Sequence, residues 1–163
     1  MKTENNLKAA FAGESQANRK YTAFARKAEE EGYPGVAKLF RAAAEAEAIH
    51  AYSELKALGA IKSTGENLQA AIEGETYEFT EMYPGFIKEA EEEASSQAKR
   101  AFNLANEAEK VHAELYKKAL ANLASKADMD YFICTVCGYI HENGVPDRCP
   151  VCGAAPKAFK NVG

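Results

Sequence analysis

Two stretches of the sequence decide the fold, AEEEGYPGVAKLFRAAAEAEAIH at residues 28–50 and AEEEASSQAKRAFNLANEAEKVH at residues 90–112. At a fixed offset of 62 positions, ten of their 23 residues are identical, including a scarce histidine that is His50 in the first copy and His112 in the second. A composition rich in Ala and Glu creates chance matches, but it does not place rare residues in register. We therefore predict that the chain contains two copies of one helical hairpin.

The composition of the whole chain agrees with a helical protein of modest size. Of the 24 acidic residues 21 are Glu, and 29 of the 32 Ala residues lie before residue 128, which is a bias toward the strongest helix formers. Hydrophobic residues make up 47% and charged residues 27%, so the chain can build a core. A length of 163 residues fits one bundle of about 120 residues with a small module, and it excludes two full-sized enzyme domains.

Charge and hydropathy exclude other classes of protein. The net charge is −4 and the Lys and Arg residues are not clustered, so we expect no nucleic-acid partner. The N-terminus MKTENNLKAAF lacks the apolar run of a signal peptide, and no stretch approaches the roughly 18 apolar residues of a membrane span. We expect a cytoplasmic protein with no membrane partner.

Apolar residues recur at helical spacing through most of the chain. Pro84 falls inside the third of these stripes, where we expect it to kink the helix without ending it, because the stripe continues beyond it. Only residues 59–62 separate the second stripe from the predicted Ser63–Thr64 cap of the third helix, and this short link leaves an exchange of hairpins between chains open. The expected helices cover residues 4–31, 34–58, 64–93 and 95–125.

The character of the sequence changes at Ala127. Beyond it the chain has Gly and Pro at turn positions and short runs of Val, Ile and Tyr, which is typical of a small β or irregular module. Below roughly 40 residues a domain usually needs a staple, which a metal bound by cysteines can supply. We expect two domains, residues 1–127 and 128–163.

The predicted helices carry a shared set of acidic and histidine side chains. A Glu-x-x-His motif in each copy of the hairpin puts both side chains on one helix face, because residues i and i+3 are neighbours there. Five carboxylates gathered in one core would repel each other and be desolvated unless cations neutralised them. Di-iron and di-manganese carboxylate bundles use this donor set, and the residues alone do not separate the two metals. The predicted metal ligands are Glu14, Glu47, His50, Glu75, Glu78, Glu109 and His112.

A single glutamate on a helix is more simply explained as a solvated surface residue, and we expect this of Glu54, Glu73 and Glu81. A lone histidine on an apolar stripe is likewise more simply a hydrogen-bonded core group. The paired motifs on a repeat argue against that simpler explanation for the ligand set.

The repeat is not perfect in the region of the predicted ligands. Glu14 matches Glu75 at an offset of 61, whereas Tyr21 matches Tyr83 at an offset of 62. Glu78 has no partner in the other copy. The two halves of the site are therefore expected to differ.

Four cysteines form two Cys-x-x-Cys pairs separated by 11 residues in the C-terminal module. Each pair can make a tight turn whose backbone N–H groups point at sulfur, and four thiolates in a tetrahedron bind zinc or a single iron. In a reducing compartment such a cluster favours a metal over disulfides, but the spacing alone leaves a structural zinc site as open as an iron site. The predicted ligands are Cys134, Cys137, Cys149 and Cys152.

These motifs together resemble the rubrerythrin family, and the resemblance covers nearly the whole chain. It implies a mainly α fold, in which a ferritin-like antiparallel four-helix bundle precedes a small C-terminal rubredoxin-like metal-binding domain. It also implies two iron ions in the bundle and one iron ion on the four cysteines, where zinc substitution is the alternative. The strings that carry the resemblance are AFAGESQANRKY at residues 10–21, EAEAIH at 45–50, GETYEFTEMYP at 74–84, EAEKVH at 107–112 and the two Cys-x-x-Cys pairs.

The resemblance implies a role for each bundle ligand. Glu47 and Glu109 resemble the carboxylates that bridge the two irons. Glu14 and Glu75 resemble the terminal carboxylates, and His112 resembles an imidazole ligand of one iron.

The resemblance also implies a redox-dependent side of the site. In the family, the residues that resemble Glu78 and His50 are alternative ligands of one iron, which moves between them as its oxidation state changes. Tyr21 and Tyr83 resemble tyrosines that hydrogen-bond to ligand carboxylates. The expected catalytic residues are Glu78, His50, Glu47 and Glu109.

The activity that the resemblance implies is reduction of hydrogen peroxide to water, as a protection against oxidative stress. Two ferrous ions would supply two electrons, and the four-cysteine iron, which has no open coordination position, would return them one at a time. Rubredoxin or an NAD(P)H-dependent reductase would be the electron donor, and a homodimer or larger assembly is expected.

Two other functions stay open on the sequence. A ferroxidase or iron-storage protein would share the bundle but has no need of a redox-active tail. A non-enzymatic binding module with a zinc-stapled tail would be colourless and contain zinc only.

Overall fold

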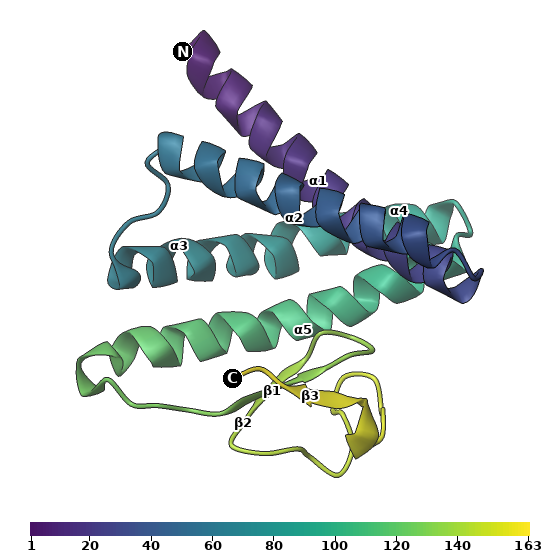
Figure 1. Cartoon of the computed structure of the whole chain (residues 1–163). Helices are drawn as coiled ribbons and strands as arrows, with labels where there is room; N and C mark the ends of the chain where they lie inside the picture. The colour runs from purple at the N-terminus through teal and green to yellow at the C-terminus, as the bar shows by residue number, and fades with distance from the viewer. The chain divides into compact units, whose positions relative to one another are not determined.

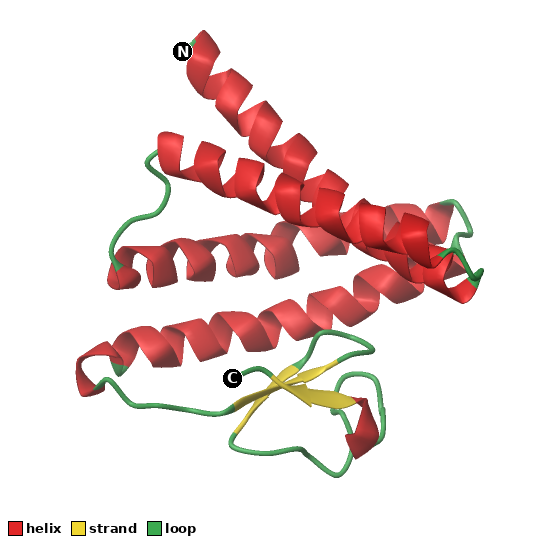
Figure 2. Ribbon diagram, in the orientation of Figure 1, coloured by secondary structure: helices red, strands yellow, loops and turns green.

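The computed structural model describes residues 1–163, which form two compact units, residues 1–62 and residues 63–163 (Figure 1). Helices make up most of both units, and the few strands lie in the C-terminal segment (Figure 2). None of the helices combines the length and the hydropathy that crossing a membrane would require.

The first unit is a helical hairpin of α1, Lys2–Glu30, and α2, Pro34–Ala57. The turn between them uses Gly32 at φ +80°, a left-handed conformation that favours glycine. Pro34 occupies the first turn of α2, where its missing N–H leaves no hydrogen bond unmade. The two helices predicted for this part of the chain are confirmed to within two residues at each end.

The two helices of this hairpin approach each other through small side chains. The buried side chains of residues 1–62 are all alanines, namely Ala25, Ala28, Ala37, Ala44 and Ala51. Beside them Tyr21, Phe24 and Phe40 form an aromatic cluster with ring centroids 5.5 to 6.2 Å apart. The hairpin therefore has no fully buried large side chain, and helices in stable domains normally bury their apolar face against a further layer.

The second unit begins with the helices α3, Thr64–Tyr77, α4, Tyr83–Glu92, and α5, Ser96–Ala121. Ser63 caps α3 as predicted, because its side chain accepts a hydrogen bond from the N–H of Glu66. The Glu66 carboxylate in turn accepts from the Ser63 N–H at 3.2 Å, which completes a capping box. A short 3-10 turn, η2 at Leu123–Ser125, follows α5.

A π-helical turn, η1 at Glu78–Met82, joins α3 to α4. Each hydrogen bond of a π-helix runs from residue i to i+5, so one turn accommodates an extra residue. This extra residue accounts for the change in repeat offset, from 61 at Glu75 to 62 at Tyr83. Pro84 lies just after the π turn, and the helix continues through it as predicted.

The C-terminal segment forms a three-stranded antiparallel sheet in the order β2-β1-β3. Its strands are β1, Tyr131–Cys134, β2, Ile140–Glu142, and β3, Phe159–Asn161, with a 3-10 turn, η3 at Pro156–Ala158, before the last strand. The core of this segment consists of Cys134, Tyr139 and Cys149, and Val111 of α5 packs against it. An apolar core of this size is too small to keep the segment folded by itself, so its fold depends on the metal ion that the sequence predicts at the four cysteines.

Candidate metal centres

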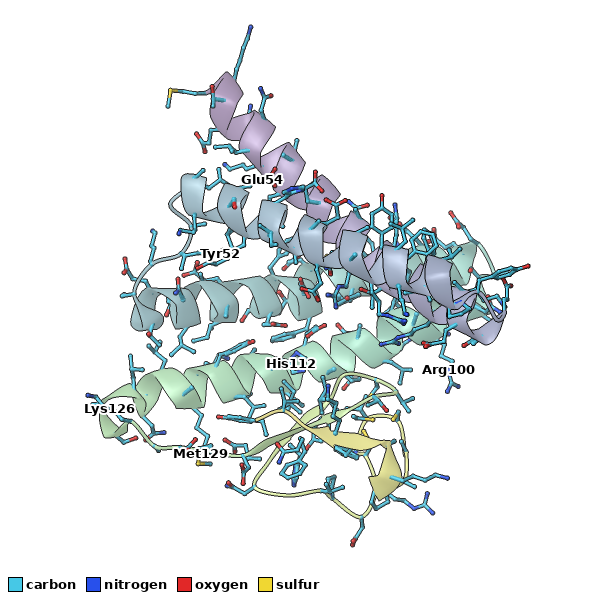
Figure 3. The ribbon with its side chains drawn as sticks, viewed as in Figure 1. Tyr52, Glu54, Arg100, His112, Lys126 and Met129 are labelled. Atoms are coloured by element: carbon cyan, nitrogen blue, oxygen red, sulfur yellow. The ribbon has the colours of Figure 1, made fainter.

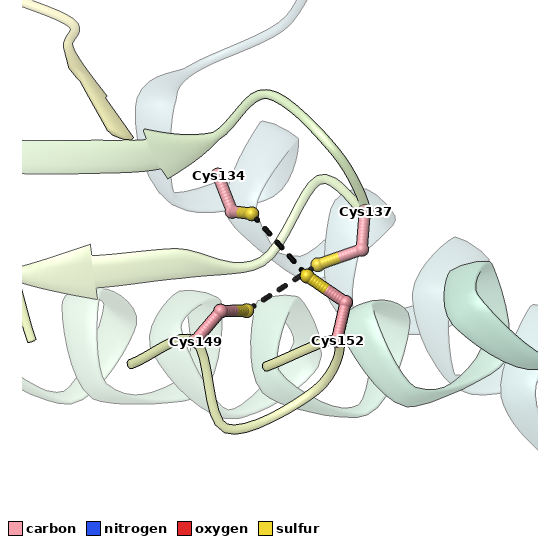
Figure 4. Close-up of side chains that lie close together, drawn as sticks. All are labelled: Cys134, Cys137, Cys149 and Cys152. Carbon is pink, nitrogen blue, oxygen red and sulfur yellow. Dashed lines mark hydrogen bonds between the residues drawn. The ribbon is translucent and has the colours of Figure 1, made fainter. Parts of the chain in front are cut away.

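The four cysteines meet in the C-terminal segment (Figure 4). Cys134 and Cys149 are buried, Cys137 and Cys152 are half-buried, and none forms a disulfide. Sγ of Cys134 lies 3.6 Å from Sγ of Cys152, and Sγ of Cys137 lies 3.5 Å from Sγ of Cys149. Four sulfurs at about 2.3 Å from one tetrahedral ion would lie about 3.8 Å from each other, so the cluster fits a single metal ion.

Backbone N–H groups surround these sulfur atoms, as the Cys-x-x-Cys turns predicted. Burial acts to raise the pKa of the Cys134 thiol, but the N–H groups of Val136 and Cys137 donate to its sulfur and hold that pKa below its usual value. At Cys137 burial raises the pKa above its usual value, although the Tyr139 N–H donates to the sulfur. A bound cation favours thiolate at all four positions, so metal uptake releases protons.

Glu75 of α3 and Glu109 and His112 of α5 form a group that we call the second cluster, with one potential ligand atom of each residue within 4.8 Å of the others. Nδ1 of His112 lies 2.6 Å from Oε2 of Glu109 and 3.7 Å from Oε2 of Glu75. The three side chains are only 16% to 21% exposed. Atoms that carry lone pairs face each other here, so a proton or a cation must lie between them.

The backbone beside Cys137 orients the histidine of the second cluster. Nε2 of His112, on α5 (Figure 3), lies 2.9 Å from the carbonyl oxygen of Gly138. Because a carbonyl oxygen only accepts hydrogen bonds, Nε2 carries the proton. Nδ1 is then left facing the glutamates, which is the usual arrangement of a metal-binding histidine whose other nitrogen is hydrogen-bonded to the protein.

The first hairpin carries a matching group, Glu14, Glu47 and His50, which we call the first cluster. Nδ1 of His50 lies 3.0 Å from Oε2 of Glu47 and 3.9 Å from Oε2 of Glu14, so the same ring nitrogen is used in both copies of the repeat. A hydrogen bond with Glu47 raises the pKa of the Glu14 carboxyl. His50 is 60% exposed, and no hydrogen bond within residues 1–62 holds its Nε2, so it is less restrained than His112.

Glu78 begins the π turn of the second unit and does not belong to the second cluster. Burial and the charge of Glu75 raise the pKa of Glu78, and the charge of His112 lowers it, so Glu78 lies within electrostatic reach of that cluster. The structure places Glu78 and His50 in different units, and their exchange as ligands of one iron stays a prediction.

Tyr83 also lies near the second cluster. Burial and the charges of three neighbouring glutamates raise its pKa. Together Tyr83, Phe86 and Phe102 repeat the aromatic cluster of the first unit, with ring centroids 5.5 to 6.4 Å apart. The hydroxyls of Tyr21 and Tyr83 donate no hydrogen bond to a ligand carboxylate in the structure, so that role stays a prediction.

Two further residues near the metal clusters were not among the predicted ligands. Burial and the charges of the second-cluster glutamates raise the pKa of Tyr116. Its counterpart in the repeat is Glu54, whose Oε2 is buried without a hydrogen-bond partner. The prediction that Glu54 is solvated is therefore wrong, whereas Glu73 and Glu81 are exposed as predicted. Each missed residue lies four positions after a motif histidine, and that helical spacing could have identified both.

Both clusters fit metal ions by their donor chemistry. Burial, and then a hydrogen bond with Glu109, raises the pKa of Glu75 to about 7. A cation bound beside such a carboxyl group lowers its pKa, so the group binds the cation as a carboxylate. Carboxylate oxygen and imidazole nitrogen are donors that suit iron and manganese.

The metal-free protein is expected to lose stability as the pH rises from about 5 to about 8. The folded-state pKa of Glu75, about 7, lies above its ordinary value of 4.5, so its contribution is complete below pH 4.5 and is lost as the pH rises through 7. The loss in the free energy of unfolding amounts to at most about 3 kcal/mol. Urea unfolding of the metal-free protein at several pH values measures it. Glu75→Gln should flatten the dependence, and an unchanged slope in that variant would contradict the assignment.

Comparisons with known proteins agree with this architecture. A family model described as rubrerythrin matches residues 5–120, and a model described as the rubrerythrin rubredoxin-like domain matches residues 132–160. Nigerythrin from Nitratidesulfovibrio vulgaris is 41% identical over 92% of this chain and 81% of its own length. Rubrerythrin from Porphyromonas gingivalis is 40% identical over 97% of this chain and 88% of its own length.

Solved structures of nigerythrin are similar as well. The partially reduced state matches with a TM-score of 0.61 at 40% identity, over 98% of this chain and 86% of the nigerythrin chain. The fully reduced, all-ferrous state matches with the same TM-score and coverage at 39% identity.

Fold and site together define the class of the protein: it is mainly α, with a ferritin-like four-helix bundle that carries a small C-terminal rubredoxin-like domain. The chain belongs to the rubrerythrin family, whose members are oxidoreductases. Its cofactors are those of the family, a di-iron site in the bundle and an iron site on the four cysteines, as predicted.

Proposed function

We propose that this protein is a non-haem di-iron peroxidase, which reduces hydrogen peroxide to water and protects the cytoplasm against oxidative stress. One observation carries the proposal. A single chain holds two carboxylate–histidine clusters and a four-cysteine site, and the hydrogen bond from His112 to Gly138 joins the second cluster to the backbone next to Cys137. A storage protein has no need of a redox-active tail, so this connection between two metal sites supports electron transfer from one to the other.

The division of chemistry between the sites follows from their ligands. When bound, the two bundle irons would supply two electrons, which convert one hydrogen peroxide molecule and two protons into two water molecules. The four-cysteine iron would then return two electrons to the bundle irons, one at a time. We assign Glu47 and Glu109 as bridging carboxylates and Glu14 and Glu75 as terminal carboxylates of this site. The four cysteines leave no coordination position for a substrate, so their site only carries electrons.

The residues beside the second cluster can hold the protons that the reaction consumes. The pKa of Glu78 is raised by burial and by the charge of Glu75, so its carboxyl keeps a proton to a higher pH than an exposed glutamate does. We assign Glu78 and His50 as the alternative ligands on the redox-dependent side. Tyr21 and Tyr83 would support the ligand carboxylates through their hydroxyl groups.

The proposal includes a role for each of the two domains, an electron donor and an oligomeric state. Residues 1–127 would form the peroxide-reducing bundle and residues 128–163 the electron-transfer domain. Rubredoxin or an NAD(P)H-dependent reductase would deliver electrons to the four-cysteine site. The active form would be a homodimer or a larger assembly.

An anaerobic titration tests the function. The iron-loaded protein is reduced chemically and then given hydrogen peroxide, and each equivalent of peroxide should oxidise two bundle irons of the reduced protein. With NAD(P)H and a rubredoxin-linked reductase present, peroxide consumption should continue in proportion to NAD(P)H oxidation. Oxidation by dioxygen with iron deposition, and no consumption of peroxide, would instead support a ferroxidase.

The Glu78→Ala protein is expected to lose peroxide turnover by about 10- to 100-fold, the range found when groups that support a metal site are removed. Its melting temperature and its bundle iron content should stay near those of the wild type, because Glu78 lies outside the second cluster and His50 remains as the alternative ligand. Glu81→Ala is the matched control, since Glu81 belongs to the same π turn but is exposed. Wild-type turnover in Glu78→Ala with both bundle irons bound would remove Glu78 from the mechanism.

A further inference from the structure

Two polar contacts hold β2 and the turn before it against α5. Nε2 of His112 donates to the carbonyl oxygen of Gly138 at 2.9 Å, as described above. Six residues further along the helix, Nζ of Lys118 donates to Oε2 of Glu142 at 2.5 Å. Six residues of a helix rise about 9 Å and four residues of a strand at most about 13 Å, so the two segments run side by side in the same direction.

Between these two contacts the segments meet through apolar side chains. Residues two apart in a strand point to the same side of the sheet, and Ile140 lies midway between Gly138 and Glu142. Ile140 lines a cavity of 290 Å³ together with Leu115 and Ala119 of α5. Because a gap remains in the middle, directional contacts at the two ends are needed to fix the sheet on the helix.

The hydrogen bond at Gly138 does not fix the orientation of the sheet by itself. Together with Val111, which packs against the core around the cysteines, it anchors one end of the contact, about which the sheet could still turn. The ion pair at the other end removes this rotation. Glu142 is only 20% exposed, so its carboxylate has lost part of its hydration and depends on the ammonium group of Lys118 to balance its charge.

The ion pair of Lys118 differs from those of its neighbours on α5. Lys110 pairs with Glu107 and Lys117 with Glu114, in each case one turn away on the same helix. Such pairs support the helix alone. The pair of Lys118 instead joins residues 24 positions apart and connects the helix to the four-cysteine segment.

We propose that Lys118 and Glu142 are positioning residues for electron transfer: their ion pair holds the four-cysteine site in the orientation that allows the hydrogen bond between His112 and Gly138. Neither side chain belongs to a metal cluster, so both act through other residues. In each transfer one electron leaves the reduced four-cysteine iron and is taken up by one oxidised bundle iron. The proposal rests on the electron flow of the proposed function, and it adds the residues that set its geometry.

Reversal of the charges tests the pair. Lys118→Glu places two carboxylates side by side and should release the sheet from the helix. Lys118→Glu combined with Glu142→Lys forms an ion pair of opposite polarity and should restore the contact. Lys117→Glu is the matched control, because Lys117 is the adjacent residue and undergoes the same change of charge, but it pairs within α5.

The first measurement needs neither iron nor peroxide. The 15N relaxation of the full-length protein with zinc on the four cysteines reports whether residues 131–161 tumble together with α5. In the wild type, in Lys117→Glu and in the protein with both charges reversed, the sheet should have the rotational correlation time of the helix. In Lys118→Glu that of the sheet should be shorter. A sheet that still tumbles with the helix in Lys118→Glu would overturn the proposal.

The second measurement uses the iron-loaded protein. Fully reduced protein is mixed with hydrogen peroxide, and the return of the red absorbance of the ferric four-cysteine site gives the rate of electron transfer to the bundle. This rate should fall about two- to fivefold in Lys118→Glu, the factor that one ion pair of this kind contributes. The preceding oxidation of the bundle irons should keep its wild-type rate, because their ligands are unchanged.

Recovery of the transfer rate when both charges are reversed distinguishes positioning from a general loss of structure. A doubly reversed protein as slow as Lys118→Glu would contradict the proposal. If the wild-type protein does not reduce peroxide at all, the proposed function fails, while the relaxation measurement still decides whether the ion pair holds the sheet on α5.

Discussion

The Glu109→Gln protein is expected to retain less than about a tenth of the bundle iron of the wild type after anaerobic reconstitution. Glu109 lies 2.6 Å from Nδ1 of His112 and is hydrogen-bonded to Glu75, so it is the central acceptor of the second cluster. An amide of the same shape offers a neutral oxygen in place of a carboxylate and cannot bridge two cations. Peroxide turnover should fall to background together with the iron.

The same substitution should have the opposite effect on the metal-free protein. Removal of one carboxylate relieves the unfavourable proximity of Glu109 to Glu75, so the pKa of Glu75 should fall and the free energy of unfolding near pH 7 should rise. Glu107→Gln is the matched control, because Glu107 lies on the same helix but is exposed and is paired with Lys110. Iron analysis checks the result, and bundle iron that survives in Glu109→Gln would contradict the assigned ligand.

The Cys134→Ser protein is expected to lose the four-cysteine iron and the fold of the C-terminal segment. Cys134 is 1% exposed and belongs to the small core of this segment, and a module of this size normally depends on its metal for stability. Turnover driven by NAD(P)H through a reductase should fall to background. Bundle irons that have been reduced chemically should still react once with peroxide, because their ligands are intact.

The visible spectrum, iron analysis and the two kinetic assays check this result. Val136→Ala is the matched control, since Val136 lies between two of the cysteines but is 55% exposed. Reductase-driven turnover that persists in Cys134→Ser would show that electrons reach the bundle without the four-cysteine site. That outcome would leave the C-terminal segment without its proposed role.

Most of the fold could be predicted because its signals are local. Helical periodicity, the Ser63 cap and the proline after Tyr33 depend on residues close in sequence, and the structure confirms each of them. The metal-ligand types could also be predicted, since Glu-x-x-His and Cys-x-x-Cys place their side chains together through the geometry of a single turn. The structure brings together the four cysteines and, in each hairpin, one Glu-x-x-His pair with a glutamate of the neighbouring helix.

The π turn was present in the sequence only as a change of offset. An extra residue can be absorbed by a loop, a bulge or a π turn, and only backbone hydrogen bonding distinguishes between these. The hydrogen bond from His112 to Gly138 joins residues 26 positions apart, and no periodic pattern encodes such a contact. The buried Oε2 of Glu54 was missed for a related reason, because burial depends on the neighbouring helix and not on the residue type.

The sequence by itself determined the duplicated hairpin, the candidate metal ligands and the four-cysteine module, because spacing along a helix or a tight turn places those side chains with little freedom. Only the tertiary structure decided which nitrogen of His112 faces the glutamates and how the extra residue near Glu78 is accommodated. It also showed that each unit of the chain holds half of the donor set. These features depend on contacts between segments far apart in the chain, whose geometry follows from packing and hydrogen bonding and not from local sequence preference.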